Sequence, residues 1–254
     1  MRVDYEHELL ALELRDSDRL QVEFVVLNVK SGELSVPYRS PENWWIGLEE
    51  AYGRVLYLHG FGNKAVGTHK GITAVTMDSF QVLWQQDEVI FYGFAPDSRI
   101  LARPVETEKE FFLALDAQTG AILESGISPV EAQFLVSGFN QQRTNSCKYP
   151  VHYPANSEHF ALVSQFIFSR SGRQAQGAID YLETEKFLIL GYHELATENK
   201  WRNFLGVYSA VDGLLLFEEV LMDSGSGLSQ DSFFIMNNTL LYIKEKNTLV
   251  GYYL

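Results

Sequence analysis

A short strand–turn–strand pattern recurs along the chain and limits the folds that it can adopt. The clearest copies are Val25–Leu34, Phe112–Leu123 and Leu205–Leu216, and looser copies are Ile72–Trp84 and Phe160–Gly172. Each clear copy has an apolar run, a polar turn containing Gly, and a second apolar start. An Asn or Asp side chain in such a turn can bond the backbone further along, and Gly supplies a positive φ. Each copy therefore predicts a β-hairpin.

The spacing of these turns predicts a repeat architecture. The turn positions are Gly32, Phe80, Gly120, Gly172 and Gly213, and the steps between them are 48, 40, 52 and 41 residues. A four-stranded propeller blade uses roughly 40–50 residues. The chain is therefore predicted to be an all-β, β-propeller-like single domain over residues 1–254, with about five to six antiparallel blades.

Further strands are predicted between the turns and in the tail. They are Trp44–Leu48, Arg54–Leu58, Val89–Phe94, Ile100–Val105, Ala178–Leu182, Phe187–Tyr192, Phe233–Met236, Leu240–Lys244 and Leu249–Tyr253. Since the tail has no outer strand of its own, Glu8–Leu14 is a candidate to complete the last blade, so that the two termini close the propeller. Only Pro129–Phe134 and Leu195–Lys200 are compatible with a helix. The polar segment Asn140–Ser157 is expected to be an insertion or extended loop.

Charge and cysteine content narrow the classes of partner and the compartment. Asp plus Glu number 33 and Lys plus Arg number 20, for a formal charge of −13. A surface this acidic repels phosphate backbones and anionic lipids. Neither a nucleic acid nor a membrane is therefore expected as a partner. The acidic start Met1–Glu8 does not resemble a signal peptide. Cys147 is the one cysteine and is predicted to be a loop thiol, so a cytoplasmic protein is expected.

Two resemblances follow from these patterns. The run of aliphatic residues, Asp, a small residue, Thr and Gly in Phe112–Leu123, with a Trp ending Ile72–Trp84, resembles the blades of quinoprotein-type propellers. The chain as a whole resembles an uncharacterised family of cytoplasmic proteins of about this length from Bacteroidetes, on Asn43-Trp44-Trp45, Leu56–Gly60 and His69–Val75. The family resemblance implies a propeller-like fold with no assigned activity. No quinone or other cofactor is expected, because the vicinal cysteine pair of many quinone dehydrogenases is missing.

The sequence carries no recognisable catalytic or metal-binding motif. The six histidines show no His-x-x-x-His spacing, and there is no Gly-x-Ser-x-Gly motif. Ser224–Ser226 lies in a Gly-Ser loop with no nearby His in the sequence. The pairs Glu49-Glu50, Glu218-Glu219 and Asp87-Glu88 are adjacent, and adjacent side chains of a strand face opposite sides. They are therefore expected to be solvated charges rather than a paired acid and base, and neither catalytic residues nor metal ligands are predicted.

One stretch combines aromatic, titratable and cationic side chains. The predicted ligand-binding residues are Trp44, Trp45, His59, Asn63, Lys64 and His69, which flank two consecutive strand connections and are expected at one rim. The alternatives are that the tryptophans pack between blades and that the histidines anchor loops by bonding carbonyl groups. Trp201 is a second candidate for an exposed anchor, and Asn140–Arg143 offers donors for a carboxylate or a peptide backbone.

Two classes of function remain open. The first is a non-catalytic binding or scaffold module that holds an unidentified protein, peptide or small molecule. The alternative is a hydrolase or lyase whose polar groups converge at the channel mouth of the propeller from distant parts of the chain. Convergence of histidines or carboxylates in space would separate the two classes.

Overall fold

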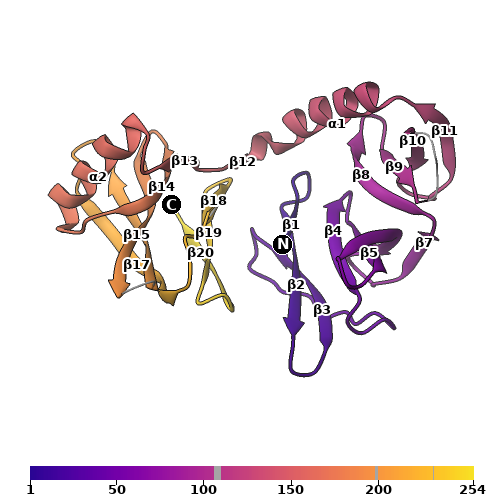
Figure 1. The fold of residues 1–254 in the computed structure, drawn as a ribbon, viewed down its shortest axis with the longest axis horizontal. Coiled ribbons are helices and arrows are strands. Elements are labelled where there is room, and N and C mark those ends of the chain that lie inside the picture. The colour runs from indigo at the N-terminus through magenta and orange to yellow at the C-terminus, as the bar shows by residue number, and fades with distance from the viewer. Residues whose placement is uncertain (106–109, 198–199, 231) are drawn as a thin grey trace. The chain divides into compact units, whose positions relative to one another are not determined.

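The computed structural model describes residues 1–105, 110–197, 200–230 and 232–254, and the chain divides into two compact units, Met1–Ser146 and Cys147–Leu254 (Figure 1). Strands dominate both units, and the sheets formed by the described residues pair their strands antiparallel. The predicted all-β class with several antiparallel sheets is therefore confirmed. That residues 1–254 form a single domain of about five to six blades stays a prediction.

The first unit contains three sheets in chain order. The first holds β1 (Arg2–Asp4), β2 (Leu9–Asp16) and β3 (Gln21–Asn28). The second holds β4 (Ile46–Tyr52), β5 (Val55–Asn63), β6 (Thr68–Thr76) and β7 (Val82–Gln86). The third holds β8 (Val89–Ala95), β9 (Arg99–Pro104), β10 (Phe112–Asp116) and β11 (Ile122–Ile127), and is followed by α1 (Pro129–Arg143) and the 3-10 turn η1 (Thr144–Ser146). In each sheet, strands that are neighbours in the sequence are paired.

Two apolar layers lie between the sheets of the first unit. Phe24 of β3 and Leu48 and Leu58 of the second sheet belong to one buried cluster. Tyr57 of β5 and Phe94 of β8 belong to the next, between the second and third sheets. Because side chains alternate along a strand, β5 serves both layers, with Leu58 facing one and Tyr57 the other.

Trp84 closes the contact between the second and third sheets. Its indole nitrogen donates to the carbonyl oxygen of Ala117 at 3.0 Å, and its ring covers Gly120. A Cβ atom on Gly120 would lie 2.6 Å from that ring, so only glycine fits here. The carboxylate of Asp116 shapes the same turn by accepting from the backbone N–H groups of Gln118 and Thr119. Trp84 is therefore buried in the apolar cluster between the second and third sheets.

The second unit has two sheets and a helix. One sheet holds β12 (Cys147–Lys148), β18 (Phe233–Met236), β19 (Thr239–Lys244) and β20 (Thr248–Tyr253). The other holds β13 (Val151–Pro154), β14 (Gln176–Glu183), β15 (Phe187–Thr197), β16 (Lys200–Ser209) and β17 (Leu215–Gly225). Helix α2 (Glu158–Ser171) packs on this five-stranded sheet, with Ile167 buried against Ile179 and Leu190.

The predicted hairpin over Phe160–Gly172 is wrong, because this segment forms most of α2. Ser157 caps the helix by accepting from the N–H of Phe160, and Gly172 ends it in the left-handed region at φ 73°. The N–H of Gly172 donates to the carbonyl oxygen of Phe168, four residues earlier. The same hydrogen bond, from an N–H to the carbonyl oxygen four residues earlier, occurs at helix C-termini and in the hairpin turns of this chain. The sequence pattern therefore did not distinguish a helix end from a hairpin turn at Gly172.

Four other predicted turn positions do close hairpins. The backbone N–H groups of Gly32, Phe80, Gly120 and Gly213 each donate to the carbonyl oxygen four residues earlier, and all four residues have positive φ. Phe80 adopts this conformation at φ 53° although it is not glycine.

Three smaller predictions about local structure are also wrong. Leu195–Lys200 is not helical in its described residues, because β15 runs to Thr197 and β16 begins at Lys200. Asn140–Ser157 is not one extended loop, since it contains the end of α1 and the strands β12 and β13. Cys147 is buried in β12 rather than exposed in a loop.

The predicted closure of the propeller by the two termini is wrong. Strand β2, which contains most of Glu8–Leu14, pairs with β1 and β3, and β20 is paired with β19. A tight turn joins β2 to β3, in which the Asp16 carboxylate accepts from the N–H groups of Asp18 and Arg19 at 3.0 Å. Such a short connection costs less chain entropy than pairing across the whole sequence.

Neither helix in the described part of the chain has the length and apolar character of a membrane-spanning segment.

Candidate functional site

The hairpin formed by β5 and β6 brings three rings together. His59 and Phe61 lie on the same face of β5, and His69 is paired with Phe61 across the hairpin. The imidazoles of His59 and His69 are stacked, with ring centroids 3.5 Å apart and an interplanar angle of 11°. The edge of Phe61 packs against both rings, at 5.1 Å and 5.7 Å. The two histidines, which were expected at one rim, therefore meet.

A bulge in β4 adds a carboxylate to this group. Leu48 pairs with Leu58 and Glu50 pairs with Tyr57, so Glu49 is the extra residue between them. Bulges re-aim side chains out of the regular alternation. The Oε2 atom of Glu49 lies 2.9 Å from Nδ1 of His59 and 2.8 Å from Nδ1 of His69. Among the described parts of the chain, these three side chains are the group whose ligating atoms come within 4.8 Å of one another.

His59 occupies a space that glycine leaves open. It is 6% exposed, and a Cβ atom on Gly47 would lie 2.6 Å from its Nε2 atom. Although Nδ1 of His59 is close to Glu49, the contact does not have hydrogen-bond geometry, and this buried nitrogen has no hydrogen-bond partner among the described residues. His69, in contrast, exposes 43% of its side chain. Burial works against ionisation of Glu49, but the adjacent imidazoles hold its pKa below the usual glutamate value.

Trp45 and Lys64 extend the group at one side. The Trp45 ring meets Phe61 edge-on at 5.7 Å, and Nζ of Lys64 lies 5.1 Å from the centroid of the Trp45 ring. Glu42 holds the loop before β4 by accepting from the N–H groups of Trp44 and Trp45, and these bonds lower its pKa. We call the set Trp45, His59, Phe61, Lys64 and His69 the hairpin site.

Two of the predicted residues point elsewhere. Trp44 packs against the apolar layer between the first two sheets, and the guanidinium of Arg15 lies 5.1 Å from its ring centroid. The side-chain oxygen of Asn63 accepts from the N–H of Ala65 within the β5–β6 turn. Neither side chain forms a hydrogen bond or a ring contact with the two histidines in the described part of the chain. The hairpin site therefore contains four of the six predicted residues: Trp45, His59, Lys64 and His69.

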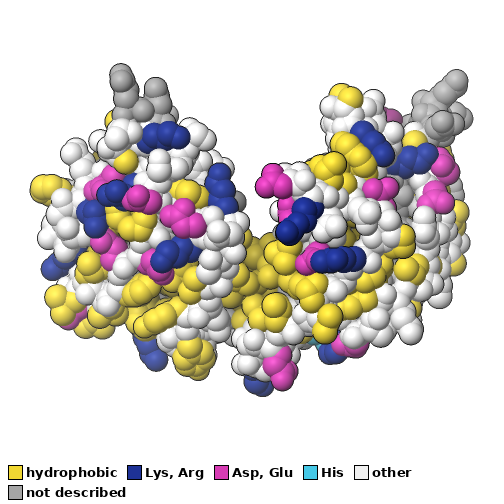
Figure 2. Space-filling model, turned by 90° about the horizontal axis from the view of Figure 1, so that it is seen from below, with side chains coloured by type: hydrophobic (Ala, Val, Ile, Leu, Met, Phe, Trp, Pro, Cys, Tyr) yellow, Lys and Arg dark blue, Asp and Glu magenta, His cyan; other side chains and the backbone are white. Residues whose placement is uncertain are grey.

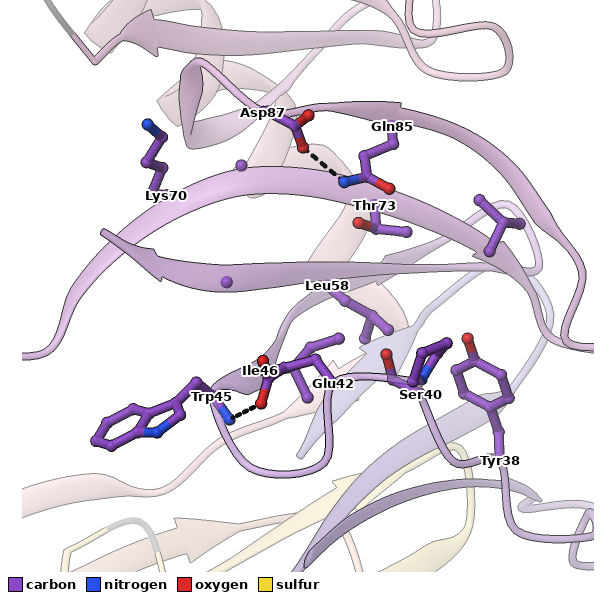
Figure 3. Close-up of a pocket in the computed structure, with 14 residues that line it drawn as sticks. Tyr38, Ser40, Glu42, Trp45, Ile46, Leu58, Lys70, Thr73, Gln85 and Asp87 are labelled. Carbon is purple, nitrogen blue, oxygen red and sulfur yellow. Dashed lines mark hydrogen bonds between the residues drawn. The ribbon is translucent and has the colours of Figure 1, made fainter. Parts of the chain in front are cut away.

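A pocket of about 330 Å³ lies on the other face of the second sheet (Figure 3). Leu58 and Gly60 line it, whereas His59 and Phe61 of the same strand face away from it. Trp45 lies at one end of the pocket in Figure 3, and Gln85 donates to Asp87 at 2.6 Å on the opposite wall. Trp45 is thus shared by the pocket and the hairpin site.

The second unit holds another pair of histidines, for which no role was predicted. His152 lies on β13, and its Nδ1 contacts the carboxylate of Asp180 at 2.8 Å. The Nε2 atom of His193 accepts from the N–H of Ser229 at 3.0 Å and contacts its hydroxyl at the same distance. The Gly-Ser loop therefore does approach a histidine, through Ser229 rather than Ser224 or Ser226. No sequence signal marks this contact, because 36 residues separate the partners.

The acidic pairs are not simply solvated charges. Glu50 binds Arg143 at 2.5 Å, Glu218 binds Arg173 at 3.0 Å, and Glu219 binds Lys244 at 2.6 Å. On the face shown in Figure 2, acidic and basic side chains are interspersed over each unit. The guanidinium predicted to receive a carboxylate, Arg143, thus has one within the same unit. Trp201 lies half-buried on β16 rather than in a polar loop.

Only part of the chain matches a known family model. Residues 3–84 match the family model described as "Domain of unknown function (DUF4905)", which covers less than half of the chain but includes the hairpin site. No curated protein matches the chain significantly. The predicted resemblance to an uncharacterised family is supported to this extent, and a bacterial group of origin stays a prediction.

Several solved structures align at low similarity. BamB from Moraxella catarrhalis is 10% identical with a TM-score of 0.33, over 99% of this chain and 75% of that chain. A europium-containing methanol dehydrogenase is 10% identical with a TM-score of 0.30, over 96% of this chain and 49% of that one. The WD40 domain of SCAP from fission yeast is 11% identical with a TM-score of 0.29, over 100% and 55%. Scores this low do not establish a shared fold, so the architecture rests on the strand pairing described above.

Proposed function

We propose that the chain is a non-catalytic binding module of propeller type and that it holds a small ligand at the hairpin site. The observation that carries the proposal is the convergence of Trp45, His59, Phe61, Lys64 and His69 on one hairpin. Sheets of four sequential antiparallel strands, such as β4–β7 and β8–β11, have the strand order of propeller blades, which supports the fold part of the proposal. A cytoplasmic location is part of the same proposal.

The chemistry of the hairpin site favours a ligand with a flat ring and an anionic group. Trp45 and Phe61 are only partly buried and offer aromatic surface, which stacks well on another ring. Lys64 is exposed next to them and carries a positive charge. The imidazole of His69 adds a hydrogen-bonding group at the exposed side of the stack. Sites of this kind combine apolar walls with a few polar groups that fix the orientation of the ligand.

Binding of benzoate, with benzyl alcohol as the uncharged equivalent, tests the proposal. Saturation-transfer NMR should detect benzoate on the wild-type chain more strongly than benzyl alcohol. Trp45→Ala and Lys64→Ala should each weaken benzoate binding several-fold, because each removes one element of the site. Val82→Trp, which fills the pocket on the other face of the sheet, and Trp201→Ala in the second unit are the controls and should bind as the wild type does.

Two outcomes contradict the proposal. One is the absence of benzoate binding to the folded wild-type chain. The other is equal binding by Lys64→Ala and wild type, since an exposed lysine can be removed without loss of folding. Loss of binding in Val82→Trp alone would indicate that benzoate binds in the pocket rather than at the hairpin site.

The alternative function, a hydrolase, has one arrangement in its favour. Ser229 and His193 are in contact, as a nucleophile and its base are in many hydrolases. However, Nε2 of His193 also accepts from the backbone N–H of Ser229, and Asn203 donates to the Ser229 hydroxyl at 2.5 Å. These bonds occupy the groups that a reaction would need, which favours a structural role as a loop anchor.

A further inference from the structure

The side chains of Glu49, His59 and His69 offer the donor set of a divalent cation site. Two imidazole nitrogens and one carboxylate oxygen are the ligands that zinc takes in many catalytic and binding sites, where a fourth position stays open. Here, Oε2 of Glu49 lies 2.9 Å and 2.8 Å from the two Nδ1 atoms. The three ligands come from two adjoining hairpin strands and the bulge of β4, so the backbone holds them together before any ion binds.

A second observation points to a missing partner. Nδ1 of His59 is buried, faces Glu49 and makes no hydrogen bond within the described parts of the chain. Buried polar atoms are almost always paired, so an orphaned ring nitrogen beside two other ligating atoms needs an explanation. The edge of the neighbouring Phe61 packs against both imidazoles and gives the group an apolar wall on that side. An ion bound between the three atoms would give the orphaned nitrogen its partner.

The ligand separations are close to those that zinc requires. With Zn–N and Zn–O bonds of about 2.0–2.2 Å, tetrahedral ligand atoms stand about 3.3 Å apart. The observed N–O separations of 2.8 Å and 2.9 Å need to open by only a few tenths of an ångström. Calcium and magnesium prefer oxygen ligands, so two imidazoles argue against both. The donor set therefore selects zinc or a chemically similar transition metal.

The stacked rings identify which side chain must move. Each imidazole coordinates a metal through a lone pair in the plane of its own ring. Two nearly parallel rings with centroids 3.5 Å apart cannot both point such lone pairs at one ion. His59 packs tightly against Gly47, because a Cβ atom on Gly47 would overlap the imidazole ring. His69 exposes 43% of its side chain and is the ring that is free to turn.

We propose that Glu49, His59 and His69 bind one Zn²⁺ ion through Oε2 and the two Nδ1 atoms, with His69 turning out of the stack. The carboxylate neutralises one of the two charges of the ion, and the fourth position is left for water or an incoming anion. This inference deepens the proposed function and rests on it in one respect, since the open position would receive the anionic group of the ligand at the hairpin site.

Metal binding without any organic ligand tests the inference. Tag-free, chelator-stripped full chain is titrated with Co²⁺, whose visible absorption reports four-coordinate geometry, and then with Zn²⁺ in competition. One equivalent of Co²⁺ should bind per chain and be displaced by Zn²⁺. His69→Ala and Glu49→Gln should each lower the affinity at least about tenfold. The matched control is His159→Ala, an exposed histidine of α2, which should leave the affinity unchanged.

The choice of variants keeps the test clear of folding defects. His59 is buried and its replacement can unfold the unit, whereas His69 is exposed and Glu49 lies at a bulge. Thermal unfolding of each variant checks that the fold is kept. Equal Co²⁺ affinity in His69→Ala and His159→Ala would overturn the inference, as would the absence of stoichiometric binding to the folded wild type.

The metal and the organic ligand can be separated by two further measurements. Trp45→Ala should keep its Co²⁺ affinity while binding benzoate several-fold more weakly, because Trp45 is not a metal ligand. If benzoate binds the chelator-treated chain but Co²⁺ does not bind, the zinc site is wrong and the proposed function stands. If Co²⁺ binds at Glu49 and His69 but benzoate never binds, the zinc site stands and the organic ligand is wrong.

Discussion

Each unit of the molecule places two histidines near a carboxylate, and the two arrangements differ in how well they are satisfied. In the second unit Asp180 is 2% exposed and accepts from His152 and from both the N–H and the hydroxyl of Ser232. In the first unit, one oxygen of Glu49 faces two ring nitrogens, and Nδ1 of His59 lies 2.9 Å from it without a hydrogen bond among the described residues. A fully satisfied buried network stabilises the fold, whereas an under-satisfied one has capacity for a ligand.

The surrounding chain accounts for the difference. In the second unit, the segment after β17 supplies donors from Ser229, Gln230 and Ser232 to the histidines and to Asp180. In the first unit, the turn between β5 and β6 is exposed from Gly62 to His69 and brings no such donors to the stacked rings. Histidines near a carboxylate therefore indicate a binding site only where the rest of the chain leaves a ring nitrogen without a hydrogen bond.

Replacing the two carboxylates should give the largest difference in stability between the two sites. Asp180→Ala leaves buried donors without an acceptor and is expected to lower the free energy of unfolding by about 3 kcal/mol or more. Glu49→Gln should cost less than about 1 kcal/mol, because one of its two histidine contacts is to the exposed ring of His69 and the other, to His59, is not a hydrogen bond. Urea unfolding followed by circular dichroism measures both. Equal losses of stability would show that the two sites are alike.

Gly47→Ala should give the next largest effect. The added methyl group would lie 2.6 Å from Nε2 of His59, and overpacking of this kind costs about 1–3 kcal/mol. The same displacement of His59 should weaken Co²⁺ binding.

The matched control is Gly138→Ala in the exposed part of α1, where a Cβ atom meets nothing within 4 Å. It should stabilise the chain by about 0.5–1 kcal/mol. Similar stabilities for the two glycine variants would mean that Gly47 does not shape the site.

Ser229→Ala tests the role of the hydrogen bonds around His193 in the second unit. Loss of the hydroxyl removes its contacts with His193 and Asn203, which should cost about 1 kcal/mol. Hydrolysis of p-nitrophenyl acetate should be the same in Ser229→Ala, in the wild type and in the exposed control Ser226→Ala. A loss of hydrolysis confined to Ser229→Ala would favour the hydrolase instead.

The smallest effect is expected in the pH dependence of stability. Burial lowers the pKa of His193 from its ordinary 6.5, while the Ala178 carbonyl and Asp180 act to raise it and His152 to lower it. The unfolded chain therefore takes up the proton first as the pH falls. The stability that neutral His193 contributes is complete above pH 6.5 and is lost as the pH falls below that value.

Urea titrations at several pH values between neutrality and about pH 5 measure this loss. His193→Gln should have a flatter profile, since it has no imidazole to protonate at that position. A profile as steep as that of the wild type would assign the acid sensitivity to other groups.

Much of the local structure could be predicted, because it depends on neighbours in the chain. The turns at Gly32, Gly120 and Gly213 form where the polar and glycine residues indicated them, and the strands after Ser232 lie within a residue of their predicted bounds. The segment ending at Gly172 was misassigned because its glycine makes the same four-residue bond at the end of a helix. Local signals do not say whether the preceding residues face a sheet as a helix or pair as a strand.

The antiparallel hairpins and the approach of His59 to His69 follow from turn residues and short connections, so they could be predicted from the sequence. Three other features could be seen only in the folded chain: Glu49 joins the histidines, Trp44 turns toward the core, and Ser229 reaches His193. A bulge shifts the facing of Glu49 without any mark in the alternation of residues. The partners of a buried polar atom depend on which distant segments pack beside it, and that choice is made by the fold as a whole.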